Sequence, residues 1–578
     1  MKTSNVEKPT GPSGLQQWFP VAVWLREYQW GKFLAPDLIA AVSVAALLIP
    51  ESMGYATVAG VPVQIGLYAA PLSLIGYALF GGSRLLVFAA AGSVAAISAT
   101  VVGGLDPSDA STAITMTAAL AIAAGVVFLV AGLARMGWIV NFMSKAVMGG
   151  FITGMAIQII VGQLAGLSGI SKGSGNTFEK LWDWLSKVGS WDWTATILGT
   201  LALVLIFTIQ RVVPRVPAAL SAVVLASIVV AVSDPSIPLV ARIPEGLPQI
   251  GAPTGLSASD WATLALGGCV VALVGFSEGW GAATTVARKT HDDLEPNQEF
   301  RAFGVGLIGA GLLGGMPTTG SLSKSSAAMT AGAKTQMSNI LLAVITLLTL
   351  LFLAPAFQWL PETVLAAVVI NAMWSSANPN KVFKLWKENK IDFGLGLVTA
   401  VLVLAFDLLP AMVVGILLSI IYLVYRVSFP ARAELGRDPS TGDFEAIGWM
   451  HGSGLEDGRP DVERIPGVMI YRFAAPLVFS TAEAFKGSGK QMLIDAAAKG
   501  PLPETMVIDC EEIFYADVTG ATALHELKAY FERYHVKITL ARLHTHTRQA
   551  LTDDGVLAEI GEDHIHDSVH AAVAAAKT

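Results

Sequence analysis

Long apolar runs separated by short polar loops fill the first three quarters of the chain. A helix that crosses a bilayer needs about 20 mostly apolar residues. The pattern therefore predicts an α-helical polytopic membrane protein with fourteen segments, two of them short or broken. The runs cover residues 36–56, 63–81, 85–103, 112–134, 147–167, 193–210, 219–233, 262–287, 301–316, 320–333, 339–356, 362–378, 391–408 and 411–427.

The third and tenth runs are interrupted by small and polar residues. In the tenth, Met316–Ser321 reads as extended chain and Leu322–Gly332 as a half-helix that starts inside the membrane. In the third, large apolar residues over 85–88 are followed by the small residues Ala89–Ser93. Each interrupted run is the third of its seven, and such pairs indicate two inverted repeats with a binding site at their interface. A helix start presents free N–H groups and partial positive charge, which suits an anion.

The overall composition agrees with a membrane location. Of the 578 residues, 53% are hydrophobic and 14% are charged, and the mean hydropathy is +0.59. A soluble domain carries about 25% charged residues. The first residues lack the apolar core and cleavage site of a signal peptide, so we expect none.

Basic residues mark one set of alternate loops and predict the orientation. They include Arg84, Arg135, Lys145, Arg211, Arg288, Lys289, Lys334, Lys384, Lys387, Lys390 and Arg426. The opposite loops carry few basic residues, among them Lys172, Lys180 and Lys187. By the positive-inside rule the first set faces the cytoplasm. We therefore expect a multi-pass protein of the cell (inner) membrane with its N-terminus and tail in the cytoplasm.

The chain changes character after Arg426, where charged residues and mixed patterns begin. Strand-like stretches over 468–473, 505–510 and 536–540 alternate with helix-like stretches over 481–499, 520–534 and 546–553, which favours a sheet flanked by helices. The predicted organisation is an N-terminal region 1–35, a transmembrane domain 36–427, a linker with one irregular strand over 428–464, and an α/β domain 465–578.

Several of these stretches together resemble the sulfate permease (SulP) family of anion transporters, which carry a C-terminal STAS domain. The resemblance covers nearly the whole chain from about Trp24 and rests on Ile49–Ala56, Phe80–Arg84, Ser277–Glu278, Asn297–Glu299, Gly314–Ser325, Gly332–Thr335, Pro466–Ser480 and Ile508–Gly520. It implies seven plus seven inverted spans, an anion held between the two half-helix starts, and a cytoplasmic STAS domain. Ala89–Ala90 and Lys324 depart from the Gly-Pro and the arginine that relatives often have there, which bears on substrate identity and binding strength.

The predicted substrate-binding residues gather at the two half-helix starts. They are Ala90, Ala91, Gly92 and Ser93 in the first half, Ser321, Leu322, Ser323 and Lys324 in the second, and Tyr55 as a wall. Lys324 is a point charge that attracts an anion; the alternative is a lysine that snorkels to the cytoplasmic face. The serines either donate to anion oxygens or serve close helix packing.

Two carboxylates within the spans are candidates for ion coupling. A carboxylate beside the site repels an anion, and protonation of Glu278 would remove that repulsion and couple proton uptake to anion uptake. The alternatives for Glu278 are a permanent ion pair with Lys324 or a sodium ligand. Glu51 occupies the equivalent segment of the first half and takes the same role by symmetry. In the tail, Thr519 stands where related STAS domains are phosphorylated on serine; a helix N-cap is the simpler interpretation.

The sequence thus predicts proton-coupled uptake of an inorganic anion, sulfate by preference. The rival transport function is a bicarbonate or dicarboxylate carrier coupled to sodium. The rival of another class is a membrane-anchored anion sensor that signals through the STAS domain. We expect no enzyme activity, metal, nucleic acid or cofactor beyond the coupling proton or sodium ion. We expect a homodimer in the bilayer and a cytoplasmic protein that contacts the STAS domain.

Overall fold

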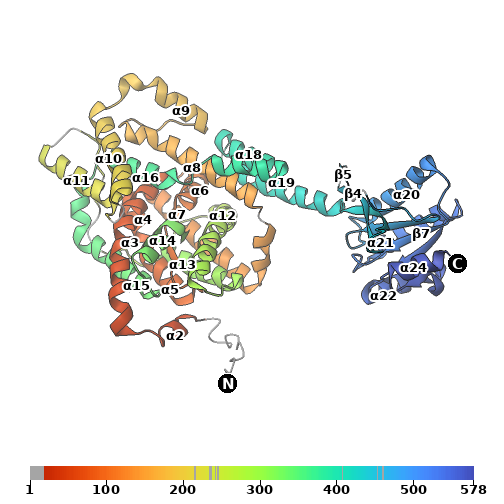
Figure 1. Cartoon of the computed structure of the whole chain (residues 1–578). Coiled ribbons are helices and arrows are strands. Elements are labelled where there is room, and N and C mark those ends of the chain that lie inside the picture. The colour runs from red at the N-terminus through yellow and green to blue at the C-terminus, as the bar shows by residue number, and fades with distance from the viewer. Residues whose placement is uncertain are drawn as a thin grey trace. The chain divides into compact units, whose positions relative to one another are not determined.

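The computed structural model describes residues 19–577 apart from 143, 214–215, 234–236, 241–242, 244–246, 407, 452–453 and 458–460. Residues 1–18 of the predicted N-terminal region therefore lie outside the described part. The chain divides into two compact units, Met1–Ser419 and Ile420–Thr578, and each is described by itself (Figure 1).

The first unit is a bundle of helices. Eight helices of the described chain are long and apolar enough to cross a membrane, and shorter apolar helices lie between them. The number of fourteen segments stays a prediction. The helices are α2 (Val21–Trp24), α3 (Trp30–Ala59), α4 (Val63–Tyr68), α5 (Ala70–Phe80), α6 (Gly92–Gly103), α7 (Ala110–Leu133), α8 (Lys145–Leu167), α9 (Thr177–Ser186), α10 (Trp193–Val212), α11 (Ala218–Ser233), α12 (Ala258–Thr290), α13 (Pro296–Leu312), α14 (Leu322–Thr330), α15 (Met337–Leu348), α16 (Glu362–Trp374), α17 (Asn380–Glu388), α18 (Lys390–Ala405) and α19 (Leu408–Ser428).

The bundle contains two groups of helices that pack mainly among themselves. The first group comprises α3, α5, α6, α7, α12, α13, α14 and α15, and the second comprises α8, α10, α11, α16 and α18. The groups meet where α3 contacts α16, α11 and α8, and where α6 contacts α8. Each group draws equivalent segments from both halves of the chain, as an inverted repeat requires.

Two short strands lie inside the first group. β1 (Val87–Ala89) precedes α6, and β2 (Thr319–Ser321) precedes α14. They pair antiparallel, with Val87 opposite Ser321, Phe88 opposite Gly320 and Ala89 opposite Thr319. The prediction of extended chain followed by a half-helix is therefore confirmed for α14, and the interrupted run of the first half has the same arrangement in β1 and α6. The pairing satisfies backbone groups that would otherwise lie unbonded at membrane depth.

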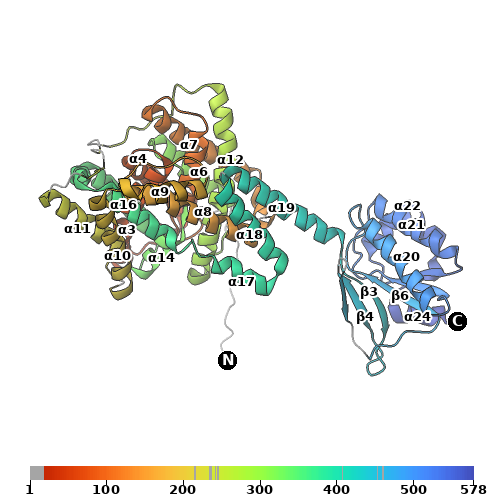
Figure 2. The ribbon, with the colours of Figure 1, turned by 90° about the horizontal axis from the view of Figure 1, so that it is seen from above.

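The second unit is a seven-stranded sheet covered on both faces (Figure 2). Its strands are β3 (Arg432–Arg437), β4 (Phe444–His451), β5 (Gly454–Asp457), β6 (Val468–Phe473), β7 (Thr505–Asp509), β8 (Lys537–Ala541) and β9 (Ile565–His566), in the order β5-β4-β3-β6-β7-β8-β9. The helices are α20 (Ala482–Lys499), α21 (Val518–Glu532), α22 (Thr545–Asp554), α23 (Val556–Ile560) and α24 (Val569–Ala576). One face packs against α20 to α23 and the other against α24.

The stretch 428–464 is more regular than the sequence predicted. Instead of a linker with one irregular strand, β3, β4 and β5 form an antiparallel ladder, and β3 pairs with β6. Ala433 and Leu435 of β3 point into the core beside α24, so apolar and polar residues alternate along this strand. This alternation was not recognised in the sequence, because turn residues and acidic side chains surround it. The sheet of the second unit therefore begins at Arg432, before the predicted boundary at 465.

Candidate functional site

Close contacts between small residues hold the β1–β2 ribbon against α12. A Cβ placed on Gly320 would lie 2.9 Å from the Cα of Gly279, so the backbones of the ribbon and of α12 touch where both residues are glycine. The Thr319 hydroxyl donates to the Gly275 carbonyl at 2.5 Å. These contacts bring Glu278, the neighbour of Gly279 on α12, to the level of the ribbon.

A serine of α14 ties the half-helix to the opposite strand. The Ser325 hydroxyl donates to the Ser321 carbonyl at 2.6 Å and accepts from the Val87 backbone N–H at 2.8 Å. One side chain thus connects the start of α14 to β1. The starts of α6 and α14 are consequently linked through β1 and β2.

Lys324 is fully buried at the start of α14. Its side chain is 1% exposed, and its Nζ lies 2.7 Å from Glu51 Oε2 and 3.2 Å from the Ala90 carbonyl oxygen. The same ammonium lies 5.3 Å from the centroid of the Tyr55 ring. The side chain therefore does not snorkel to the surface, because its charge is held inside the bundle by α3 and by the chain that leads into α6.

Glu278 does not pair with Lys324, which was one of the alternatives in the sequence analysis. The Ser93 hydroxyl, in the first turn of α6, donates to Glu278 Oε2. The ion pair of Lys324 is with Glu51 and not with Glu278. The alternative of a permanent Lys324–Glu278 pair is therefore wrong. The two carboxylates flank the start of α6, Glu51 through Lys324 and Ala90, and Glu278 through Ser93.

The remaining predicted residues line the same place or its edge. Ala90 and Ala91 are buried, and no side chain caps the start of α6 at Ala91. A Cβ on Gly92 would lie 2.8 Å from Met373 and 3.4 Å from the Tyr55 ring, so the missing side chain lets both approach the helix start. The ring of Tyr55 therefore forms a wall of the site, beside α16 of the second helix group.

The serines at the start of α14 have unequal positions. Ser321 precedes the helix, is buried, and accepts from the Lys324 backbone N–H at 3.5 Å. The Ser323 hydroxyl lies 3.1 Å from that of Ser321, and both Ser323 and Leu322 are exposed. Ser321 therefore serves as a helix cap, while Leu322 and Ser323 lie at the edge of the site.

The assembled site combines attraction and repulsion for an anion. Two helix starts and one ammonium group attract negative charge, whereas Glu51 and Glu278 repel it. An ammonium group has three N–H donors, of which Glu51 and Ala90 accept two. Within the described residues, no cluster of three His, Cys, Asp or Glu side chains is arranged to hold a metal ion.

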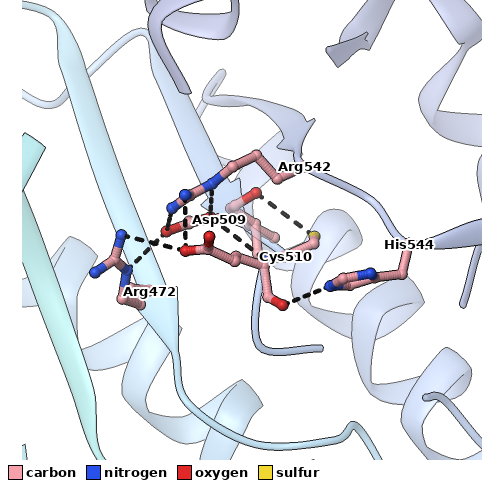
Figure 3. A network of polar contacts seen from close by, with 7 residues as sticks. Arg472, Asp509, Cys510, Arg542 and His544 are labelled. Carbon is pink, nitrogen blue, oxygen red and sulfur yellow. Dashed lines mark hydrogen bonds and ion pairs between the residues drawn. The ribbon is translucent and has the colours of Figure 1, made fainter. Parts of the chain in front are cut away.

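A second polar cluster lies at the carboxyl ends of β6, β7 and β8 in the second unit (Figure 3). Asp509 is fully buried and accepts from Arg472 Nε at 2.7 Å and from Arg542 Nη2 at 2.6 Å. A buried carboxylate needs such partners, because desolvation without them is costly. Burial raises the pKa of the adjacent Cys510 thiol, which keeps it unreactive. The cluster joins three parallel strands.

Thr519 does not cap α21. The cap is Asp517, whose carboxylate accepts from the Gly520 backbone N–H at 2.8 Å and from Phe479 N–H at 2.9 Å. The N-cap interpretation of Thr519 is therefore wrong by two residues. Aspartate caps as well as threonine does. Thr519 is exposed in the first turn of the helix.

Comparisons with known protein families and curated sequences agree over most of the chain. Residues 34–399 match the model of the sulfate permease family, and residues 459–572 match that of the STAS domain. A probable sulfate transporter of Mycobacterium tuberculosis, MT1781, is 31% identical over 561 residues, which cover 96% of this chain and 98% of the relative. High affinity sulfate transporter 2 of Stylosanthes hamata is 28% identical over 590 residues, covering 97% of this chain and 86% of the relative.

Solved structures share the fold. The murine Slc26a9 anion transporter in its inward-facing state aligns with a TM-score of 0.86 and 21% identity, over all of this chain and 96% of that one. The transmembrane domain of the cyanobacterial bicarbonate transporter BicA aligns with a TM-score of 0.57 and 21% identity, over 67% of this chain and 97% of that one. The chain is thus a multi-pass membrane transporter that belongs to the sulfate permease family and carries a C-terminal STAS domain.

Proposed function

We propose that the protein carries a small inorganic oxyanion, sulfate, into the cell together with protons. The observation that carries this proposal is the buried Lys324 ammonium at two half-helix starts, flanked by two carboxylates. The names of the curated relatives support sulfate as the substrate. The ammonium and the helix N–H groups supply attraction for an oxyanion, and a titratable carboxylate supplies the coupling.

Ser93 connects protonation of Glu278 with binding of the anion. A serine hydroxyl has one proton to donate, and in the structure it donates that proton to Glu278. When Glu278 takes up a proton, its carboxyl group donates to the Ser93 oxygen instead. The Ser93 O–H is then free to turn to an anion oxygen at the start of α6. Protonation would thus remove a repelling charge and supply a donor in the same step.

Uptake of labelled sulfate into proteoliposomes tests this mechanism. With acid outside, the unaltered protein should concentrate sulfate. Glu278→Gln imitates the protonated carboxyl group and should keep sulfate exchange at equal pH while losing accumulation driven by the pH gradient. Glu388→Gln removes one exposed carboxylate on α17 and should behave like the unaltered protein.

Three outcomes would redirect the proposal. If Glu278→Gln still concentrates sulfate when the outside is acid, Glu278 is not the coupling residue and Glu51→Gln is the next variant. Uptake that needs a sodium gradient would favour the sodium-coupled bicarbonate or dicarboxylate carrier, which the same vesicles can test with labelled anions. Binding without any transport would favour the sensor.

We extend the proposal to assembly and location. The basic loops support a cell-membrane protein with its N-terminal region and STAS domain in the cytoplasm. We propose a homodimer, and a protein partner that contacts the STAS domain near the exposed Thr519. A phosphate on Thr519 would add about two negative charges at a helix start, beside the carboxylate of Asp517.

A further inference from the structure

A separate cavity of about 190 Å³ begins one helical turn beyond the site. Val58 and Ala96 line it. On α3, Val58 follows the site residue Tyr55 by three positions, and on α6, Ala96 follows Ser93 by three positions. Three residues of helix rise about 4.5 Å. The cavity is therefore next to the site on both helices, on the side toward the carboxyl end of α6.

Two lysines line this cavity without a carboxylate of their own. Lys172 comes from the loop after α8 and Lys180 from α9, and neither forms an ion pair with any described residue. The Lys172 ammonium donates to the Thr57 carbonyl at 3.0 Å. Asp183 also lines the cavity, but it accepts from Lys187 at 2.8 Å. The cavity thus has a surplus of positive charge.

Lys172 and Lys180 are close enough for their positive charges to repel each other. Desolvation by the surrounding protein lowers the pKa of Lys172, Glu362 opposes that effect, and repulsion from Lys180 lowers the pKa further. Two ammonium groups that repel each other are stabilised by an anion placed between them.

A polar group without a partner also lies in the cavity wall. The side-chain oxygen of Gln158 is buried, and no described residue donates to it. A buried polar atom is normally satisfied by protein or by ordered water. Gln158 therefore indicates a hydrated cavity, and its amide N–H groups can donate to an anion.

We infer that this cavity is a first station for the transported anion on the outer face, where Lys172 and Lys180 capture a small divalent oxyanion before it moves along α6 to Lys324. The inference rests on the proposed function and names an additional part of its path. A cleft lined by one sign of charge raises the local concentration of an oppositely charged substrate. The station therefore sets the concentration of anion required outside and leaves the maximal rate to the inner site.

Sulfate uptake by intact cells that lack their own sulfate transporters tests whether this cavity is a first station for the anion. Lys172→Gln and Lys180→Gln should each raise the KM for external sulfate by about three- to tenfold with little change in the maximal rate, and the double variant should raise it more. Added salt should raise the KM of the unaltered protein more than that of the double variant, because salt screens the same attraction. Lys172→Arg keeps the charge and should keep the KM.

The matched control is Lys187→Gln, at the residue that follows the helix carrying Lys180. It removes one positive charge, but Lys187 is already held by Asp183 and does not line the cavity. Its KM should equal that of the unaltered protein. Everted membrane vesicles present the cytoplasmic face, and from that side the lysine variants should have an unchanged KM.

The two proposals fail in different ways. Absence of sulfate uptake by the unaltered protein would overturn the proposed function and the station with it. Normal uptake with a KM for the lysine variants equal to that of Lys187→Gln would overturn the station alone. A KM raised equally from both faces would also overturn it, because that result indicates general damage. Membrane abundance, measured for each variant, corrects the maximal rates.

Discussion

At the scale of single residues, Lys324 is a buried structural charge, paired with Glu51, and also the charge that we propose binds the anion. Its pairing with Glu51 removes two ions from water, and such a pair contributes little net stability compared with an apolar substitute. Removing only one partner destabilises the folded protein much more, because the remaining charge is then buried without a partner. A variant at Lys324 therefore has to separate loss of anion binding from loss of folding.

Lys324→Ala should weaken sulfate binding strongly, and Lys324→Arg only moderately, because arginine keeps the charge in a different shape. The double variant Lys324→Gln, Glu51→Gln removes both charges together and should fold. A hydrogen bond to a charged group contributes about 1.5–3 kcal/mol, so we expect a roughly 10- to 150-fold weaker affinity in the double variant. Calorimetry on the purified protein measures the dissociation constant. A folded double variant with unchanged affinity would show that Lys324 does not bind the anion.

The sequence singled out most of the residues that the structure brings together in the candidate site, but not which of them are partners. Lys324, Glu51, Glu278 and the half-helix starts are recognisable because charge and small residues are rare in apolar segments. Repeat symmetry made Glu51 and Glu278 equivalent, so symmetry could not decide which of them pairs with Lys324. That choice depends on how the β1–β2 ribbon places Ala90 and Ser93, and Ser93 is bonded to a residue 185 positions away.

At the scale of elements, the β1–β2 ribbon is what brings the two half-helix starts together. It can approach α12 only because Gly279 and Gly320 face each other without side chains. Neither glycine is needed for a left-handed backbone conformation, since neither has a positive φ. The two glycines matter because the absence of side chains lets the two backbones come into contact.

Gly279→Ala should therefore disturb the site from its supporting helix. The added Cβ would lie 2.4 Å from the Phe303 ring and 3.0 Å from the Gly320 nitrogen. Overpacking of this kind costs about 1–3 kcal/mol, so we expect a lower unfolding temperature and weaker sulfate binding. Gly281→Ala is the control on the same helix, since its Cβ would meet nothing within 4 Å. Equal unfolding temperatures and affinities for the two variants would contradict this role of Gly279.

The elements themselves were predictable to different degrees. The strands and helices from Val468 to Asp554 follow the sequence pattern closely, because buried strands and amphipathic helices have clear periods. The β3–β4–β5 ladder was missed because its turn residues and acidic side chains are also those of a linker.

At the scale of the whole molecule, the compact units and the sheet define where the chain can be cut. The residues of the candidate site all precede Lys334, and the first unit ends at Ser419. The sheet of the second unit starts with β3, which pairs with β6. A cut at 465 would therefore leave β3, β4 and β5 attached but remove β6, the strand that pairs with the free edge of β3.

Deletion of 430–578 should leave a folded membrane unit with a sulfate affinity within about twofold of the whole protein, because the residues of the candidate site all belong to the first unit. Deletion of 465–578 should instead expose an unpaired strand edge and promote aggregation. Size-exclusion chromatography and calorimetry on both truncated proteins measure these results. Loss of all sulfate binding in a monodisperse 430–578 deletion would mean that the STAS domain completes the site.

The separation of Glu51 and Lys324 along the chain has a consequence for biosynthesis. The two residues are 273 positions apart, so at 5–20 residues per second the ribosome needs roughly 15 to 55 seconds to add the lysine after the glutamate. During that interval α3 enters the membrane with a carboxyl group whose cation does not yet exist. The nascent first half must keep Glu51 protonated, hydrated or shielded by the insertion machinery until the second half arrives.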